Sequence, residues 1–426
     1  MARNVSEIEA CLLEHADAVF DDVLAFTKDI VKEYSVRGQE DSVLACVEAK
    51  LQALDMPVTR VGMQKAVLEQ TPHYAPVAWE HDHKYNLVSQ CNAGATGKSL
   101  VLNGHVDVVS AEPFDMWTHP PDEPLEQDGW LYGRGAGDMK SGVAAMIYAL
   151  HAVRQAGYRI TSPVTVQVVV EEECSGNGAL ACVQQGYDGD FVLIPEPFDA
   201  TIYAGQVGTL WFKLVVRGKP VHVQTVGSGI NAIAKLQRFV PYLQKLERDL
   251  NENYREGAYL DIAHPFNLNI GTITGGNWPS SVPAHAELEG RIGFPPGMSR
   301  DTIMQLVRDA IAKACAEDPA LAGDTPMLEF QGFRSEGHLV DINHPAIEVL
   351  SQCHRSLRGS DPALHWSTCT TDLRAFHVYN RTAGTCYGPI AKDIHGVDEC
   401  VDIESIRHTL RAYVLFLSRW CELAPL

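Results

Sequence analysis

Two kinds of hydrophobic pattern run along this chain, and the first is helical. Over residues 5–32 and again over 39–54, apolar positions recur at mixed spacings of three and four, with acidic residues between them. This spacing predicts amphipathic helices, the second of which ends before Pro57. The stretch 62–83 breaks the pattern and is expected to be irregular, with the His-Asp-His cluster at 81–83 in a solvated loop.

From residue 85 onward the chain carries short, largely apolar runs, several of them rich in valine. They lie at 85–90, 99–102, 164–170 and 191–194. Such runs are typical of strands buried on both faces of a mostly parallel sheet. Helical stretches at 141–156 and 178–185 alternate with them. The alternation predicts an α/β fold in which helices flank a mixed, mostly parallel sheet.

A different pattern begins near residue 208. Apolar and polar residues alternate over 267–274 and 284–292, as they do in antiparallel strands with one face in solvent. Further strands are expected at 210–216 and 327–330, and helices at 230–250 and 299–316. The resulting order β-α-β-β-α-β is typical of a ferredoxin-like α+β unit.

Helices and strands alternate again from Asp341 to Leu417. We therefore expect one larger α/β domain formed by two segments, 1–207 and 335–426. A smaller α+β domain, 208–334, would be inserted between them.

The composition is that of a globular protein and opposes a role in binding nucleic acid or membranes. With 426 residues, 46% of them hydrophobic, the chain is long enough for two or three globular domains and is not of disordered composition. Its 34 Lys and Arg against 54 Asp and Glu give a formal net charge of −20, which opposes binding to nucleic acid and to anionic membranes. No apolar run approaches the roughly 20 residues of a transmembrane helix.

Cysteine usage predicts a reducing environment. The 11 cysteines are spread along the chain and none forms a C-x-x-C pair, so we expect free thiols and a cytoplasmic protein. The first twenty residues lack a basic segment followed by an apolar stretch, and we expect no secretory signal there.

Imidazole and carboxylate groups stand where the predicted strands end. His105 ends one strand, and Asp107, two positions on, shares its face, so that its carboxylate could accept the second ring N–H. Glu171, Glu172 and Glu173 follow the run 164–170 directly. Taken singly, His105 would be an ordinary strand-end histidine and the three glutamates a solvated turn.

Three further groups have the same placement. Asp138 follows three glycines at the start of a predicted helix, where a helix cap is the plainer interpretation. Glu196 lies between two prolines after a strand, and His395 lies in a loop near the end of the chain. A loop side chain facing solvent is the alternative for both. As a set, these residues favour a site for Zn²⁺, Mn²⁺ or Co²⁺, with room for two metals and one acid left over as a general base.

Six motifs then resemble one family, the co-catalytic metallohydrolases that include aminoacylase, acetylornithine deacetylase, succinyl-diaminopimelate desuccinylase and carboxypeptidase G. They are, in the order of the family, NGHVDVV, GRGAGDMKSG, EEECSGNGA, IPEP, GKPVH and AKDIHGVDE, and a GG…VP…R pattern lies between the last two. Ser281 departs from the asparagine that many members carry, which puts one side-chain contact to substrate in doubt.

The resemblance implies a dinuclear metal centre. His105, Asp138 and Glu196 would hold one metal and Asp138, Glu173 and His395 the other, with Asp138 bridging. Zn²⁺ is expected, with Co²⁺ or Mn²⁺ as alternatives. A cis peptide between Asp138 and Met139 is also implied.

The resemblance also implies the remaining roles. Glu172 would be the general base, with Asp107 as its catalytic neighbour. His222, from the partner subunit of a homodimer, would stabilise the oxyanion, and Arg291 would bind the substrate carboxylate. The inserted domain would be the lid and dimerisation domain.

The implied reaction is hydrolysis of the amide bond of an N-acyl amino acid by a water that the two metals share. A dipeptidase or carboxypeptidase of the same family is the first alternative, because a dipeptide offers the same free carboxylate. A metal-binding module without catalysis is the distant alternative, opposed by the presence of Glu172 beside a complete ligand set.

Overall fold

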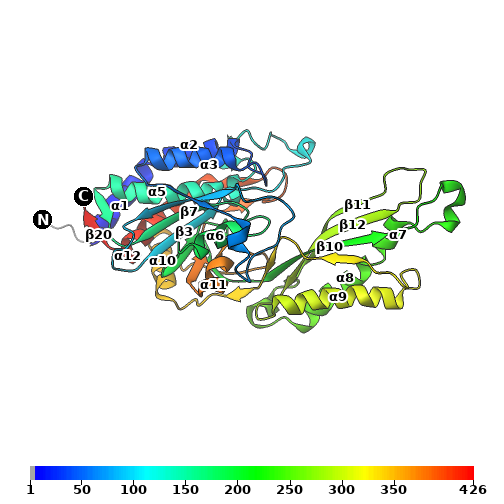
Figure 1. Ribbon diagram of the computed structural model, residues 1–426. Coiled ribbons are helices and arrows are strands. Elements are labelled where there is room, and N and C mark those ends of the chain that lie inside the picture. Colours follow the sequence, from blue (N-terminus) through cyan, green and yellow to red (C-terminus); the bar gives the residue numbers. More distant parts are fainter. Residues whose placement is uncertain (1–4) are drawn as a thin grey trace.

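The computed structural model describes residues 5–426, which form a large lobe and an elongated smaller lobe (Figure 1). The start of the described chain and its C-terminal end lie on the side of the large lobe away from the smaller one. Residues 1–4 lie outside the described part. The expected domain segment 1–207 and the expected absence of a secretory signal both include these residues.

Twelve α-helices occur in the described residues, and four of them cover the central sheet. Their bounds are Val5–Ala18 (α1), Phe20–Lys32 (α2), Asp41–Ala53 (α3), Lys65–Leu68 (α4), Ser141–Gln155 (α5), Asn177–Gln184 (α6), Ala232–Gln237 (α7), Val240–Asn253 (α8), Arg300–Glu317 (α9), Pro345–Arg358 (α10), Leu373–Asn380 (α11) and Ile403–Trp420 (α12).

Twenty strands are described, most of them short. They are Thr59–Gly62 (β1), Tyr85–Cys91 (β2), Leu100–His105 (β3), Leu125–Gln127 (β4), Trp130–Tyr132 (β5), Tyr158–Ile160 (β6), Val164–Val169 (β7), Phe191–Ile194 (β8), Ile202–Gln206 (β9), Gly208–Arg217 (β10), Leu268–Gly275 (β11), His285–Phe294 (β12), Met327–Glu329 (β13), Arg334–Ser335 (β14), His338–Leu339 (β15), Leu364–Ser367 (β16), Ala383–Cys386 (β17), Ala391–Lys392 (β18), Cys400–Asp402 (β19) and Leu423–Pro425 (β20).

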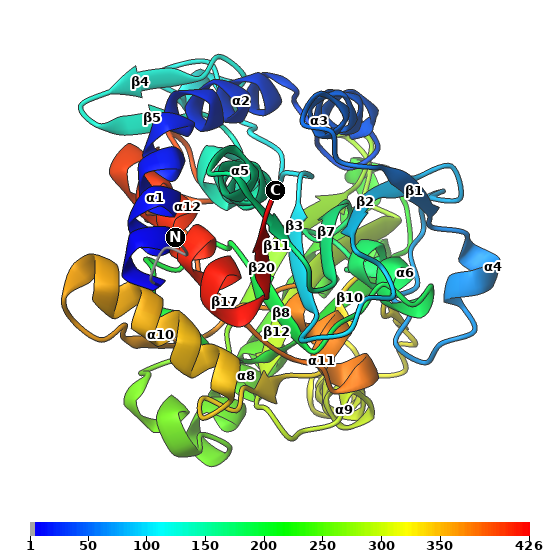
Figure 2. The same ribbon diagram turned by 90° about the vertical axis from the view of Figure 1, so that its left-hand side faces the viewer.

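The large lobe is built on a six-stranded sheet with the order β1-β2-β7-β3-β8-β17. The pairs β7/β3, β3/β8 and β8/β17 are parallel, and β1 and β2 add an antiparallel edge. Helices α5 and α12 pack side by side on one face, and α6 and α11 pack on the other (Figure 2). The α/β class with a mixed, mostly parallel sheet is therefore confirmed.

The smaller lobe has the strand order β11-β12-β10-β13, all antiparallel, with α8 and α9 packed together along it. Since β10, β11, β12 and β13 are its first to fourth strands, this is the ferredoxin-like arrangement that the sequence predicts. Leu210, Phe212, Leu214 and Leu288 turn one face of the sheet toward the helices.

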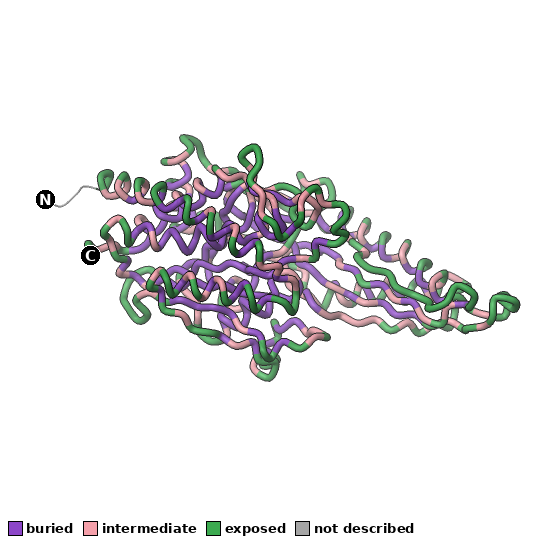
Figure 3. The backbone as a smooth tube through the Cα atoms, turned by 90° about the horizontal axis from the view of Figure 1, so that it is seen from above, coloured by how far each residue is buried: buried purple, intermediate pink, exposed green. Residues whose placement is uncertain are grey.

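Each lobe has its own hydrophobic core. One core joins buried residues from the N-terminal and C-terminal parts of the chain, and the second joins residues between Val207 and Leu321. The buried backbone runs through the large lobe, whereas the far tip of the smaller lobe is largely exposed (Figure 3). Two hydrophobic cores of this kind are what two independently packed units require.

Two predicted helices are interrupted. The stretch 5–32 divides at Val19 into α1, which packs on α12 and α5, and α2, which packs on α5. The stretch 230–250 divides near Phe239 into α7 and α8, with Pro241 in the first turn of α8. Proline lacks the N–H that a continuous helix would need there, so the helix restarts.

The remaining two expectations concern membrane-spanning helices and disulfide bonds. None of the helices among residues 5–426 is long and apolar enough to cross a membrane. All eleven cysteines are free thiols.

The topology brings the ends of three neighbouring parallel strands together. His105 is the last residue of β3, the three glutamates follow β7, and Glu196 follows β8. Because β7, β3 and β8 are adjacent and parallel, their carboxyl ends meet at one edge of the sheet, where active sites of open α/β folds lie.

Gly142 allows α5 to approach this edge. A Cβ atom at Gly142 would lie 2.3 Å from the carbonyl oxygen of Pro195, the residue before Glu196. We therefore expect Gly142→Ala to lower the free energy of unfolding by about 1–3 kcal/mol, measured by urea denaturation. Gly62→Ala is the control, because its nearest neighbour would be a side-chain atom at 3.7 Å. Equal stability of the two variants would contradict this packing argument.

Candidate active site

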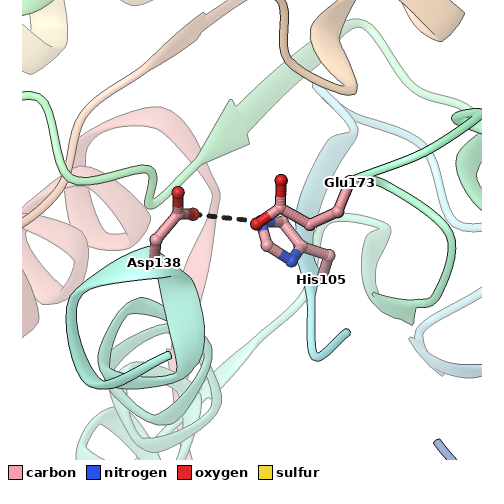
Figure 4. Close-up of side chains that lie close together, drawn as sticks. All are labelled: His105, Asp138 and Glu173. Carbon is pink, nitrogen blue, oxygen red and sulfur yellow. Dashed lines mark hydrogen bonds and ion pairs between the residues drawn. The ribbon is translucent and has the colours of Figure 1, made fainter. Parts of the chain in front are cut away.

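Asp138 lies between two histidines that come from distant parts of the chain. Its Oδ1 is 3.2 Å from Nε2 of His105, and its Oδ2 is 3.4 Å from Nε2 of His395. The carboxylate does not cap α5; it sits in the turn before that helix, and the peptide bond to Met139 is cis, as the resemblance implies. Figure 4 shows Asp138 and Glu173 facing His105.

Two more carboxylates complete the arrangement. Glu196 Oε1 lies 3.8 Å from the same His105 nitrogen, and Glu173 Oε1 lies 3.0 Å from the same His395 nitrogen. The cluster therefore divides into two groups of three that share Asp138. Ligand atoms of His105, Asp138 and Glu173 also lie within 4.8 Å of one another, so the two groups adjoin.

Burying several carboxylates close together costs free energy unless a positive charge neutralises them. Burial, followed by the negative charge of Asp138, raises the pKa of Glu196 well above its usual range. Burial also opposes ionisation of Asp138, but its hydrogen bonds with His105 and His395 outweigh that effect and lower its pKa. The charge of Glu173 is the largest cause that raises the pKa of His395, to about 11.

These residues fit divalent metal ions. Two imidazole nitrogens converge on three carboxylates, and mixed ligation of this kind suits Zn²⁺, Co²⁺ or Mn²⁺. The carboxylate of Asp138 offers one oxygen to each group of donors, as a ligand that bridges two metals must do. Cations bound there would also neutralise acids that otherwise repel one another in a buried place.

Glu172 lies beside this cluster but has different partners. Its Oε1 is 3.4 Å from Nη1 of Arg374, and both side chains are only 7% exposed. Burial, followed by the charge of Asp372, raises the pKa of Glu172 well above its usual range. Both carboxylate oxygens of Asp372 are buried without a hydrogen-bond partner. The loop at 370–372 thus supplies the surroundings of Glu172 and not a ligand of the cluster.

Asp107 does not bind His105 in the expected way. The Nδ1–H of His105 donates to the backbone carbonyl of Asp107 at 2.9 Å, while the carboxylate is 3.7 Å away. That carboxylate instead accepts the backbone N–H groups of Glu172 and Glu173 at 3.2 and 3.1 Å. The backbone bond still fixes which nitrogen of His105 faces the cluster, and the carboxylate fixes the turn that carries the two glutamates.

Glu399 and Arg134 hold both ligand loops, and sequence reasoning did not single them out. Oε1 of Glu399 accepts the backbone N–H groups of Gly137 and Asp138, each at 3.0 Å. Its Oε2 accepts from Nη1 of Arg134 at 2.5 Å, and Nη2 of Arg134 donates to the carbonyl of Gly396 at 2.8 Å. One buried ion pair therefore ties the Asp138 turn to the His395 loop.

The first of the three glutamates is also an anchor, so the interpretation of these residues as a solvated turn is wrong. Glu171 is fully buried and accepts from Nε1 of Trp79 at 2.8 Å and from the hydroxyl of Ser175 at 2.6 Å, and it pairs with Lys84 at 3.3 Å. His81 lies 3.6 Å away and is 1% exposed, so the segment 81–83 is not wholly solvated as expected. These contacts outweigh burial and lower the pKa of Glu171 to about 2.

Two expected site residues lie on the smaller lobe, outside the cluster. His222 is exposed; it precedes a short 3₁₀ turn, and its Nδ1 accepts the N–H of Gln224 at 3.1 Å. It follows the end of β10 that points away from the large lobe (Figure 1). The structure of one chain therefore does not bring His222 to the metal-ligand cluster.

Arg291 borders the cleft between the lobes. A cavity of about 340 Å³ lies there, lined by Arg37 and Trp79 of the large lobe and by Trp211 and Arg291 of the sheet in the smaller lobe. Nη2 of Arg291 donates to the hydroxyl of Thr209 at 3.4 Å, but its Nε is buried without a partner. Among the described residues Arg291 has no carboxylate partner, so its charge is available to a ligand.

Two tryptophans near the matched motifs, Trp278 and Trp366, differ in position. Trp366 packs against the core of the smaller lobe, as a core residue does, whereas Trp278 is 67% exposed. Neither lines the cavity at Arg291, where Trp79 and Trp211 lie instead.

The Glu399–Arg134 pair generates a prediction about metal affinity. Glu399→Gln keeps the shape but removes the charge that holds the Asp138 turn and pairs with Arg134, so we expect zinc to bind about 10–100-fold more weakly. Competition titration against a chelator measures this, with Glu404→Gln, an exposed glutamate of α12, as the control. Unchanged affinity in Glu399→Gln would show that the pair does not organise the site.

The chain is similar to several known proteins. An N-formyl-4-amino-5-aminomethyl-2-methylpyrimidine deformylase of Bacillus subtilis is 27% identical over 76% of this chain and 79% of its own. A succinyl-diaminopimelate desuccinylase of Wolbachia pipientis is 24% identical over 94% of this chain and 93% of its own. The structure of the dipeptidase Dug1p from Saccharomyces cerevisiae, 14% identical, superposes with a TM-score of 0.78 over 96% of this chain and 98% of its own.

The family assignment rests on a direct match. Residues 101–419, which carry every member of the cluster, match peptidase family M20/M25/M40. The chain thus belongs to peptidase family M20/M25/M40 and is a metal-dependent hydrolase of carbon–nitrogen bonds.

Proposed function

We propose that this enzyme hydrolyses the amide bond of an N-acyl amino acid. The observation that carries the proposal is the shared carboxylate of Asp138 between two groups of metal-type donors, with the buried Glu172 beside it. The names of the two curated relatives, a deformylase and a desuccinylase, support removal of an acyl group from an amine.

The proposed metal centre holds two divalent ions, with Zn²⁺ as the expected metal and Co²⁺ or Mn²⁺ as alternatives. His105, Asp138 and Glu196 would hold one ion, and Asp138, Glu173 and His395 the other. When bound, such ions lower the pKa of a coordinated water toward neutrality and polarise a carbonyl oxygen.

Glu172 is the proposed general base. It would take the proton of the attacking water and deliver it to the nitrogen of the leaving amine. Arg374 and the Asp107-bound backbone hold this side chain in place, so its carboxylate needs little reorganisation during the reaction.

Arg291 is the proposed partner of the substrate carboxylate. Its guanidinium faces the cleft without an acidic partner, and carboxylates bind arginine through paired N–H donors. The dipeptidase alternative uses the same contact and is supported by the fold that the chain shares with Dug1p.

The smaller lobe, 208–334, is the proposed lid and dimerisation domain. His222 would enter the active site of the partner subunit in a homodimer. Since its Nδ1 accepts the N–H of Gln224, the neutral ring carries its proton on Nε2, which is free to donate to an oxyanion. The eleven free thiols support a reducing, cytoplasmic location.

A panel of N-acyl amino acids and dipeptides, scored by amine release from metal-loaded enzyme, tests the reaction. We expect cleavage of the N-acyl amino acids, and a turnover about 10²–10⁴-fold lower in Glu172→Gln with metal content unchanged. Glu80→Gln, on an exposed residue of the large lobe, is the control. Faster cleavage of dipeptides would favour the alternative, and wild-type turnover in Glu172→Gln would remove its role as base.

Mixed dimers test the role of His222. A His222→Ala protomer and a Glu172→Gln protomer should each be nearly inactive alone. Random mixing should restore about a quarter of wild-type activity, because half of the dimers would contain one complete site. Activity is measured after subunit exchange, and dimers are checked by light scattering. Absence of recovery in proven mixed dimers would count against action across the interface.

A further inference from the structure

A small cavity separate from the cleft lies where the two lobes join. It has a volume of about 50 Å³. Its walls include His73, Gly176 and Arg374 of the large lobe, Arg300 at the start of α9, and Arg334 at the chain's return to the large lobe. The cavity thus contacts both lobes and the point where the chain returns from the smaller lobe to the large one.

The charge on its walls is strongly positive. Three arginines and one acid, Glu336, line it, and Oε1 of Glu336 already accepts the backbone N–H of Arg300 at 2.9 Å. Arg374 also pairs with Glu172 and Asp372 behind the wall, so the charge that lacks an acid is that of Arg300 and Arg334. Within residues 5–426, neither Arg300 nor Arg334 forms an ion pair with an acid. Arg300 donates one hydrogen bond to the backbone carbonyl of Pro72, and Arg334 donates two to that of Tyr74. Each guanidinium carries five N–H donors, so most of them are not used in these bonds.

Arg374 supplies the buried part of the site. Only 6% of this residue is exposed, and its Nη2 has no hydrogen-bond partner; the nearest carboxylate oxygen, of Asp372, is 3.6 Å away. A Cβ atom at Gly176 would lie 1.8 Å from this nitrogen, so the glycine leaves the space that the guanidinium occupies. An unpaired buried donor on a cavity wall indicates a missing acceptor.

Two helix starts add to the positive field. Helix α6 begins directly after Ser175 and Gly176, and α9 begins at Arg300; both helices have their N-terminal ends at the cavity. Such ends favour anions because their N–H groups are not used within the helix. Burial, with the charge of Arg300 as the next cause, lowers the pKa of both His73 and Arg334, as expected where cations crowd together.

We propose that this cavity binds a small inorganic oxyanion of the phosphate or sulfate type, which links the two lobes through Arg300, Arg334 and Arg374. One water needs roughly 10–15 Å³ of such space, so the cavity is the size of a few waters and excludes an N-acyl amino acid. The inference is independent of the proposed reaction, because it concerns a different cavity and a different ligand.

Titration calorimetry of the metal-loaded enzyme with inorganic phosphate, at an ionic strength kept constant with chloride, tests the proposal. We expect saturable binding that becomes about tenfold weaker or more in Arg300→Gln and in Arg334→Gln, because each change removes a charged donor. Arg308→Gln, on the exposed side of the same helix α9, should bind like the wild type. Sulfate should compete with phosphate.

Two outcomes would overturn the proposal. One is the absence of saturable phosphate binding at millimolar concentration. The other is binding that both variants retain, which would place the phosphate on the metal ions instead. Arg300 is partly exposed at a helix start, so Arg300→Gln should fold normally, and its circular dichroism spectrum checks this.

Discussion

The active site depends on one carboxylate that is shared by two imidazoles. Asp138 can face both His105 and His395 only because its backbone is held from behind by Glu399, whose second oxygen binds Arg134. Arg134 in turn holds the carbonyl of Gly396, next to His395. The same buried ion pair thus sets the distance between the two groups of donors, which no single strand or helix could fix alone.

The sheet supplies the other constraint. Three adjacent parallel strands end at the same edge and deliver one imidazole and several carboxylates to a buried place, where their charges repel. Each glutamate after β7 avoids this cost in its own way: Glu171 binds Lys84 and Trp79, Glu172 binds Arg374, and Glu173 faces His395. Three neighbouring acids therefore have three separate functions in one turn.

Much of this could be predicted from sequence, because strand ends and motif order are local signals. The apolar runs predicted four strands of the central sheet, β2, β3, β7 and β8, to within a few residues but not the edge strands β1 and β17, and the alternating pattern predicted the ferredoxin-like lobe. The break at Val19 could not be read locally, since α1 packs on α12 as well as on α5 while α2 packs on α5, and only the fold shows these contacts. Glu399 stands inside a recognised motif, but its role depends on the Asp138 turn 261 residues away, and only the fold shows this contact.

Arg374 connects Glu172, the proposed general base, to the junction of the lobes. One of its terminal nitrogens lies near Glu172 and also donates to the carbonyl of Thr371, while the other faces the cavity beside Gly176 without a hydrogen bond. A guanidinium is planar and rigid, so a ligand that draws one nitrogen constrains the other. An oxyanion bound in that cavity beside Arg300 and Arg334 would therefore act on the surroundings of Glu172 through this single side chain.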